Sequence, residues 1–129
     1  MPTEDNKALL RRYYDEVLTQ GNLAVIQELF APELVQRFLE TVAASRAAFP
    51  DLFVTIEDQL AEGDRVATRF TARGMHRGPF LGVAPTDKQV ILSAIHIHRV
   101  ENGKIAELWE EINLLSLLQQ IGALKMDSG

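Results

Sequence analysis

The side chains best suited to acid–base chemistry are two histidines that alternate with isoleucines. Residues 89–100 have the two-residue period of a β-strand, so His96 and His98 project on the same face as Val90, Leu92 and Ala94. Their imidazoles therefore leave a mostly apolar surface. The third histidine, His76, lies on the apolar face of an earlier alternating run.

Glu110 is the acidic residue that could face these histidines. It lies in the alternating run 104–112, which follows a turn at residues 101–103. A three-residue loop at this turn places Glu110 opposite Ala94 and diagonal to His96. A two-residue Asn-Gly loop shifts the register by one and turns Glu110 to the face away from His96. The sequence leaves both registers open.

A carboxyl and an imidazole that face each other in an apolar pocket can exchange protons near neutral pH. Burial raises the pKa of the acid, and pairing holds the imidazole in one tautomer. Glu110 and His96 are therefore the candidate general acid/base pair. The alternative is a structural role, in which the two side chains only hydrogen-bond to each other or reach solvent at the sheet edge. The His-x-His pair with His76 could instead bind zinc or iron, but no acidic residue follows at a typical ligand spacing, and no metal is expected.

Helices are predicted for the first half of the chain. Apolar residues recur at helical spacing over residues 4–20 and 33–48, with a short helix between them that Asn22 caps and Pro32 ends. Tyr13 and Tyr14 are neighbours in the first helix, so we expect at most one of them to point inward.

Strands are predicted for the second half, over residues 51–62, 65–76, 89–100 and 104–112, followed by a short helix over 113–122. Helices followed by an antiparallel sheet predict an α+β fold in which the helices cover one face of a curved sheet, a cone with a pocket at its open end. We expect residues 1–129 to form one domain. The predicted pocket-lining residues are His76, His98, Phe70, Leu92 and Tyr13.

Composition excludes several classes of protein. The chain has 129 residues, 47% of them hydrophobic, which suits one globular domain. Its formal net charge of -5 disfavours nucleic acid and membrane partners, and the lack of cysteine excludes disulfides and thiolate metal sites. No secretory signal, membrane-spanning segment, phosphate-binding loop or serine-hydrolase motif is present, so we expect a soluble cytoplasmic protein.

Three stretches of the chain resemble the SnoaL-like polyketide cyclase family, which belongs to the nuclear transport factor 2-like (cystatin-like) superfamily of α+β cones. They are NKALLRRYYDEVLTQGNLAVIQELFAPEL, AAFPDLFVTIEDQLAEGDRVATRFTARGMHRGPFLGVAPTDKQV and HRVENGKIAELWEEINLLSLLQQIG. The resemblance implies a cofactor-independent enzyme that closes a ring by intramolecular aldol condensation on a polyketide ester. It also implies a homo-oligomer, for which we expect a homodimer. The family's histidine falls on His96 and its catalytic aspartate on Glu110.

The chain departs from the family in two places. Glu110 stands where the cyclases carry aspartate, and the extra methylene displaces the carboxyl by about an ångström. The segment after Pro32 is short where family members have a longer loop, so we expect a shallower or more open pocket. Two other functions stay open, a non-catalytic pocket for a hydrophobic small molecule and an enzyme like the epoxide hydrolases or isomerases.

Overall fold

The computed structural model describes residues 2–123, so residue 1 and residues 124–129 of the predicted domain lie outside the described part. The helical half contains α1 (Thr3–Arg12), the π-helix η1 (Tyr13–Thr19), the 3-10 turn η2 (Leu23–Val25), α2 (Ile26–Leu29) and α3 (Pro32–Ala48). It is followed by β1 (Phe53–Glu62), β2 (Arg65–Met75), β3 (Gln89–Glu101), β4 (Lys104–Ile112) and α4 (Leu114–Gln120).

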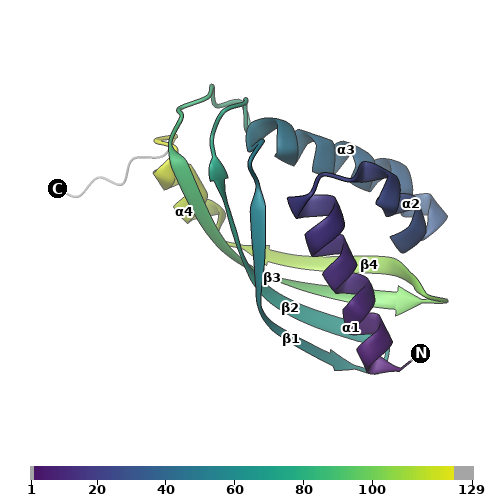
Figure 1. Ribbon diagram of the computed structural model, residues 1–129. Helices are drawn as coiled ribbons and strands as arrows, with labels where there is room; N and C mark the ends of the chain where they lie inside the picture. The colour runs from purple at the N-terminus through teal and green to yellow at the C-terminus, as the bar shows by residue number, and fades with distance from the viewer. Residues whose placement is uncertain (1, 124–129) are drawn as a thin grey trace.

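The four strands form one antiparallel sheet in the order β1-β2-β3-β4. The sheet is curved and open, with α1, α2 and α3 on its inner side and α4 at the far end, next to the loop between β2 and β3 (Figure 1). The predicted α+β class, with helices over one face of a curved sheet, is confirmed. No helix among the described residues is long and apolar enough to cross a membrane.

Alternation along the strands decides which face is buried. On β2, Val66 and Phe70 point inward and are buried, whereas Arg65, Arg69 and Arg73 are exposed on the outer face. The inward residues pack with apolar side chains from α1, η1, α2 and α3 into the main core. A second cluster, formed by Ala48, Phe49, Val90, Leu117 and Ile121, closes the end of the sheet beside α4.

The first helix changes from α-helical to π-helical geometry at Tyr13. Its widened turn is visible at the C-terminal end, where the Gln20 amide donates to the Asp15 carbonyl, five residues earlier, at 3.0 Å. A wider turn rotates each residue through a smaller angle, so two neighbours can face the same side. Tyr13 and Tyr14 are accordingly both buried, and the prediction that at most one would point inward is wrong.

The C-terminal end of η1 is held by Arg46 of α3. The Arg46 guanidinium donates to the carbonyls of Leu18 (2.7 Å), Thr19 (3.0 Å) and Pro50 (2.9 Å), two of which are carbonyls that the end of the helix leaves unpaired. Gly21 follows with φ of +73°, and a Cβ there would lie 2.7 Å from Arg46 Nε. Glycine is therefore required both for the left-handed turn and for the close approach of Arg46.

The β3–β4 hairpin combines a tight turn with a β-bulge. Asn102 and Gly103 both have positive φ and form a two-residue loop, so Glu101 pairs with Lys104. The register then shifts by one at Ala106, where Arg99 pairs with Glu107 while Val100 pairs with Ile105. The shift moves every later residue of β4 to the opposite face and brings Glu110 directly opposite His96. Neither of the two registers considered from the sequence included this bulge.

Candidate active site

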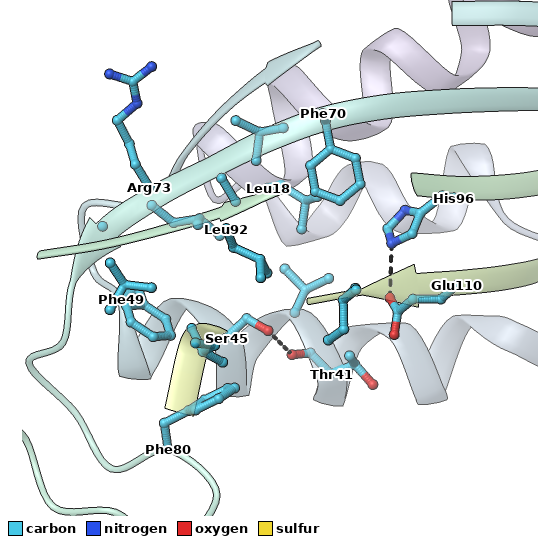
Figure 2. A pocket seen from close by; sticks show the side chains of 18 of the residues that line it. Leu18, Thr41, Ser45, Phe49, Phe70, Arg73, Phe80, Leu92, His96 and Glu110 are labelled. Carbon is cyan, nitrogen blue, oxygen red and sulfur yellow. Dashed lines mark hydrogen bonds and ion pairs between the residues drawn. The ribbon is translucent and has the colours of Figure 1, made fainter. Parts of the chain in front are cut away.

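A cavity of about 240 Å³ lies between the inner face of the sheet and α3. Figure 2 shows His96 and Glu110 at one end of it and Phe49 and Phe80 at the other. Its wall is mostly apolar and includes Leu18, Val42, Leu52, Val54, Phe70, Ala72, Val90, Leu92, Ile112 and Leu117. The cavity can therefore enclose an apolar molecule and present one end of it to the two polar groups.

His96 and Glu110 form a hydrogen-bonded pair at one end of this cavity. His96 Nε2 and Glu110 Oε2 are 2.9 Å apart, because the two residues are direct cross-strand partners on β3 and β4. The His96 side chain is 6% exposed and the Glu110 side chain 48% exposed. The imidazole thus belongs to the protein interior, and the carboxylate stands where the cavity meets solvent.

Tyr14 of η1 occupies the other side of the His96 ring. Its hydroxyl lies 2.9 Å from His96 Nδ1 in a buried contact, and the Phe70 ring packs edge-on against the imidazole with centroids 4.7 Å apart. With Glu110 ionised, His96 Nε2 carries the proton that reaches the carboxylate, and Nδ1 accepts from Tyr14. Sequence reasoning missed this partner because it assumed regular α-helical spacing, in which neighbouring residues lie about 100° apart, and so expected at most one tyrosine to point inward.

The pair makes Glu110 a base at neutral pH. The hydrogen bond from His96 is the largest cause that holds the pKa of Glu110 below its ordinary value of 4.5, the charge of Arg37 adds to it, and partial burial opposes it. The expectation that burial would raise the pKa of the carboxyl is therefore wrong, because Glu110 is half exposed and His96 stabilises its charged form. Burial raises the pKa of Tyr13 and Tyr14, so both hydroxyls stay protonated.

Three of the five predicted pocket residues, Phe70, Leu92 and Tyr13, line the same cavity as the pair. His98 does not, because it lies two residues further along β3, where the rings of Tyr13 and Tyr14 cover it. Its two ring nitrogens are buried and have no hydrogen-bond partner among the described residues. Burial lowers the pKa of His98 to about 3, so its ring is neutral.

His76 is also outside the cavity wall. It follows the end of β2, where it is fully buried beside the Phe49 ring, with its Nδ1 3.0 Å from the Thr86 hydroxyl. Phe49 and Phe80 line the cavity at that end, in contact with each other. Within residues 2–123, no group of three histidine, aspartate or glutamate side chains converges as metal ligands.

Comparison with known proteins identifies relatives along nearly the whole chain. The sequence profile of a family described as SnoaL-like polyketide cyclase matches residues 8–121. No curated protein sequence gives a significant match.

Several solved structures have a very similar fold. TsrD from Streptomyces laurentii is 24% identical with a TM-score of 0.91, covering 96% of this chain and 99% of its own. AclR from Streptomyces galilaeus, a candidate hydroxylase, is 28% identical with a TM-score of 0.87, covering 98% of this chain and 87% of its own. IdmH from Streptomyces antibioticus, a candidate polyketide cyclase, is 28% identical with a TM-score of 0.79, covering 91% of this chain and 98% of its own.

Proposed function

The chain belongs to the SnoaL-like polyketide cyclase family, and on this premise we propose that it is a cofactor-independent enzyme that closes a ring by intramolecular aldol condensation. The substrate is an apolar carbonyl compound with an acidic C–H group, such as a polyketide ester. The observation that carries the proposal is the Glu110–His96 pair, 2.9 Å apart at the solvent end of an apolar cavity.

Glu110 acts first as a general base. Its carboxylate removes a proton from the carbon next to a carbonyl, and the electron pair of that C–H bond forms an enolate. The enolate carbon then attacks a second carbonyl carbon of the same molecule, which forms the new C–C bond and an alkoxide. The alkoxide takes the proton back from Glu110, so the carboxylate is restored and no external reagent is consumed.

His96 supports this cycle by holding the carboxylate. Its Nε2–H bond to Glu110 Oε2 keeps the acid ionised before the reaction and fixes the direction in which the carboxylate points. Tyr14 holds the opposite nitrogen of the same ring. Catalysis depends on a carboxylate placed to within a fraction of an ångström. The rigidity of the hydrogen-bonded series Tyr14–His96–Glu110 therefore matters for the rate.

The cavity limits the size of the substrate. Its volume of about 240 Å³ lies below the range of roughly 300–1,000 Å³ that is typical of pockets for drug-sized ligands. A compound of one or two rings fits inside, and a longer chain must extend past Glu110 into solvent. This suits a reaction at one end of a polyketide chain.

Turnover by matched variants tests the proposal. Mass spectrometry and NMR of the products measure the cyclisation of 1,3-dicarbonyl esters. We expect Glu110→Gln to abolish this cyclisation and to leave the circular dichroism spectrum unchanged. Glu111→Gln is the control, because Glu111 is the next residue of β4 and belongs to the outer face. Equal turnover by the wild type and Glu110→Gln would remove Glu110 from the mechanism.

We further propose that two copies of the chain associate through the outer face of the sheet. Ile91, Ile95, Ile97 and Trp109 are 53%, 48%, 39% and 42% exposed there, and contiguous exposed apolar residues of this kind mark interaction surfaces. Arginines of β2 flank it on one side and acidic residues of β4 on the other. A two-fold axis along β3 would place the arginines of each copy over the acidic residues of the other.

Light scattering on the purified protein tests this association. We expect a dimer for the wild type and a monomer for Ile95→Lys, whose side chain lies near the middle of this face. Thr55→Lys on β1, away from β3 in the strand order, is the control. A wild-type monomer at micromolar concentration would contradict the proposal.

A further inference from the structure

The enolate that Glu110 would generate needs a hydrogen-bond donor, and the cavity wall supplies few. Two of its polar residues, Thr41 and Ser45, donate their hydroxyl protons to backbone carbonyls of α3, at 2.9 and 3.1 Å. The Arg73 guanidinium points away from the cavity (Figure 2) and lies 5.9 Å from the Phe53 ring on the outer face. Both ring nitrogens of His96 are already bonded.

Tyr13 is the remaining polar residue of the wall. Its side chain is held by neighbouring rings, with centroids 5.2 Å from Tyr14 and 5.3 Å from Phe30. Among the described residues, the Tyr13 hydroxyl makes no hydrogen bond. It is also not one of the fully enclosed polar atoms, so it is accessible from the cavity that the Tyr13 side chain lines. A hydroxyl placed in this way can donate to a molecule in the cavity.

We propose that the Tyr13 hydroxyl donates a hydrogen bond to the carbonyl oxygen of the substrate and stabilises the enolate oxygen that forms when Glu110 takes the α-proton. This assignment rests on the proposed function of the site and adds the group that receives the developing charge. The ligand it selects is a neutral ketone or ester whose carbonyl oxygen faces η1.

The charge movement explains why a donor is needed at this place. As the proton reaches Glu110, the negative charge leaves the carboxylate, the C–H electron pair becomes a C=C bond, and the carbonyl π pair moves onto oxygen. A fixed donor at that oxygen stabilises the enolate more than the neutral ketone, which is the requirement for lowering the barrier. Burial and the charge of Glu110 raise the pKa of Tyr13, so its proton is shared with the substrate and not transferred.

The π-helix provides this donor. The widened turn of η1 lets Tyr14 hold the imidazole while Tyr13 faces the ligand.

Binding of a ketone probe tests the assignment without depending on turnover. Isothermal titration with 2-tetralone, a two-ring ketone, is compared with tetralin, the same ring system without the oxygen. We expect Tyr13→Phe to weaken 2-tetralone binding by roughly three- to tenfold, the effect of one neutral hydrogen bond, and to leave tetralin binding unchanged. Thr71→Val is the control, because Thr71 is on the outer face of β2 and outside the cavity wall, so its loss should change neither affinity.

Each outcome separates this assignment from the proposed reaction. An equal loss of affinity for both probes, or no loss for 2-tetralone, overturns the role of Tyr13 even if Glu110-dependent chemistry is observed. A selective loss for 2-tetralone supports the role even if no ring closure is found. Failure of the wild type to bind either probe overturns the ketone site itself.

Discussion

Replacing Tyr14 with phenylalanine removes the hydroxyl whose hydrogen bond to His96 joins η1 to the sheet. The aromatic ring and its packing against Phe70 are retained, so the change isolates the hydrogen bond to His96 Nδ1. The variant leaves a buried imidazole nitrogen without a partner. An unsatisfied buried acceptor costs about 1–3 kcal/mol, and we expect the free energy of unfolding to fall by this amount.

The adjacent residue supplies the matched control. Tyr13→Phe also removes one oxygen from a buried ring, but it breaks no hydrogen bond among the described residues, so we expect a smaller loss of stability than for Tyr14→Phe. Urea denaturation followed by circular dichroism measures both values. For a domain of this size, a loss of 1–3 kcal/mol should also lower Tm by several degrees.

The comparison of the two variants decides whether the reasoning is correct. Equal destabilisation by Tyr14→Phe and Tyr13→Phe would show that the Tyr14 hydroxyl does not bond to His96 in solution. It would also remove the role assigned to Tyr14 in holding the His96 ring.

Three further predictions concern pH and the end of η1. The folded state keeps His98 neutral with a pKa of about 3, whereas the unfolded chain protonates it near 6.5, so the free energy of unfolding falls by up to about 1.4 kcal/mol per pH unit as pH drops from 6 to 4. His98→Phe should remove this slope in urea titrations at several pH values, and an unchanged slope would contradict the burial of a neutral ring. The pKa of Glu110 is lowered, so its pairing stabilises the fold above pH 4.5 and this contribution disappears as pH falls through the folded-state pKa. The difference in unfolding free energy between wild type and Glu110→Gln should therefore shrink on acidification, and a difference that grows would reverse the sign assigned here. Arg46→Met keeps the aliphatic stem but loses the bonds to Leu18 and Thr19, so thermal denaturation should show a loss of about 1.5–3 kcal/mol, whereas Arg11→Met, on exposed α1, should show little change.

Most of the fold could be predicted from the sequence because its signals are local. Val66, Thr68 and Phe70 alternate with more exposed residues, and this pattern predicted both the strand and its buried face. Pro32 and Gly21 marked the limits of helices. The register that brings Glu110 opposite His96 was harder to predict from the sequence. It depends on one extra residue in β4, Ala106, which forms the β-bulge. The backbone carbonyl of the preceding residue, Ile105, accepts a hydrogen bond from the Ala31 amide at 2.9 Å. That contact joins β4 to the connection between α2 and α3, and no pattern within β4 encodes it.

The tyrosines and His98 illustrate the same limit. The period of α1 predicts which residues point inward only while the turn stays α-helical, so the change at Tyr13 removed the basis of the prediction. His98 shares the inward face with His96, yet its position under η1 is a consequence of how the helix crosses the sheet. The period of a strand predicts which face of the sheet a residue occupies. Which of those residues line a cavity depends on how distant segments pack over that face.

Hydrogen–deuterium exchange at carbon tests the central claim, that Glu110 is a base for carbon acids, without requiring the natural substrate. In D₂O, the α-protons of 2-tetralone can be followed by NMR in the presence of wild-type protein, Glu110→Gln or no protein. We predict faster loss of the α-proton signal with wild type than without protein, and no acceleration by Glu110→Gln. Equal exchange rates with wild type and Glu110→Gln would contradict the account.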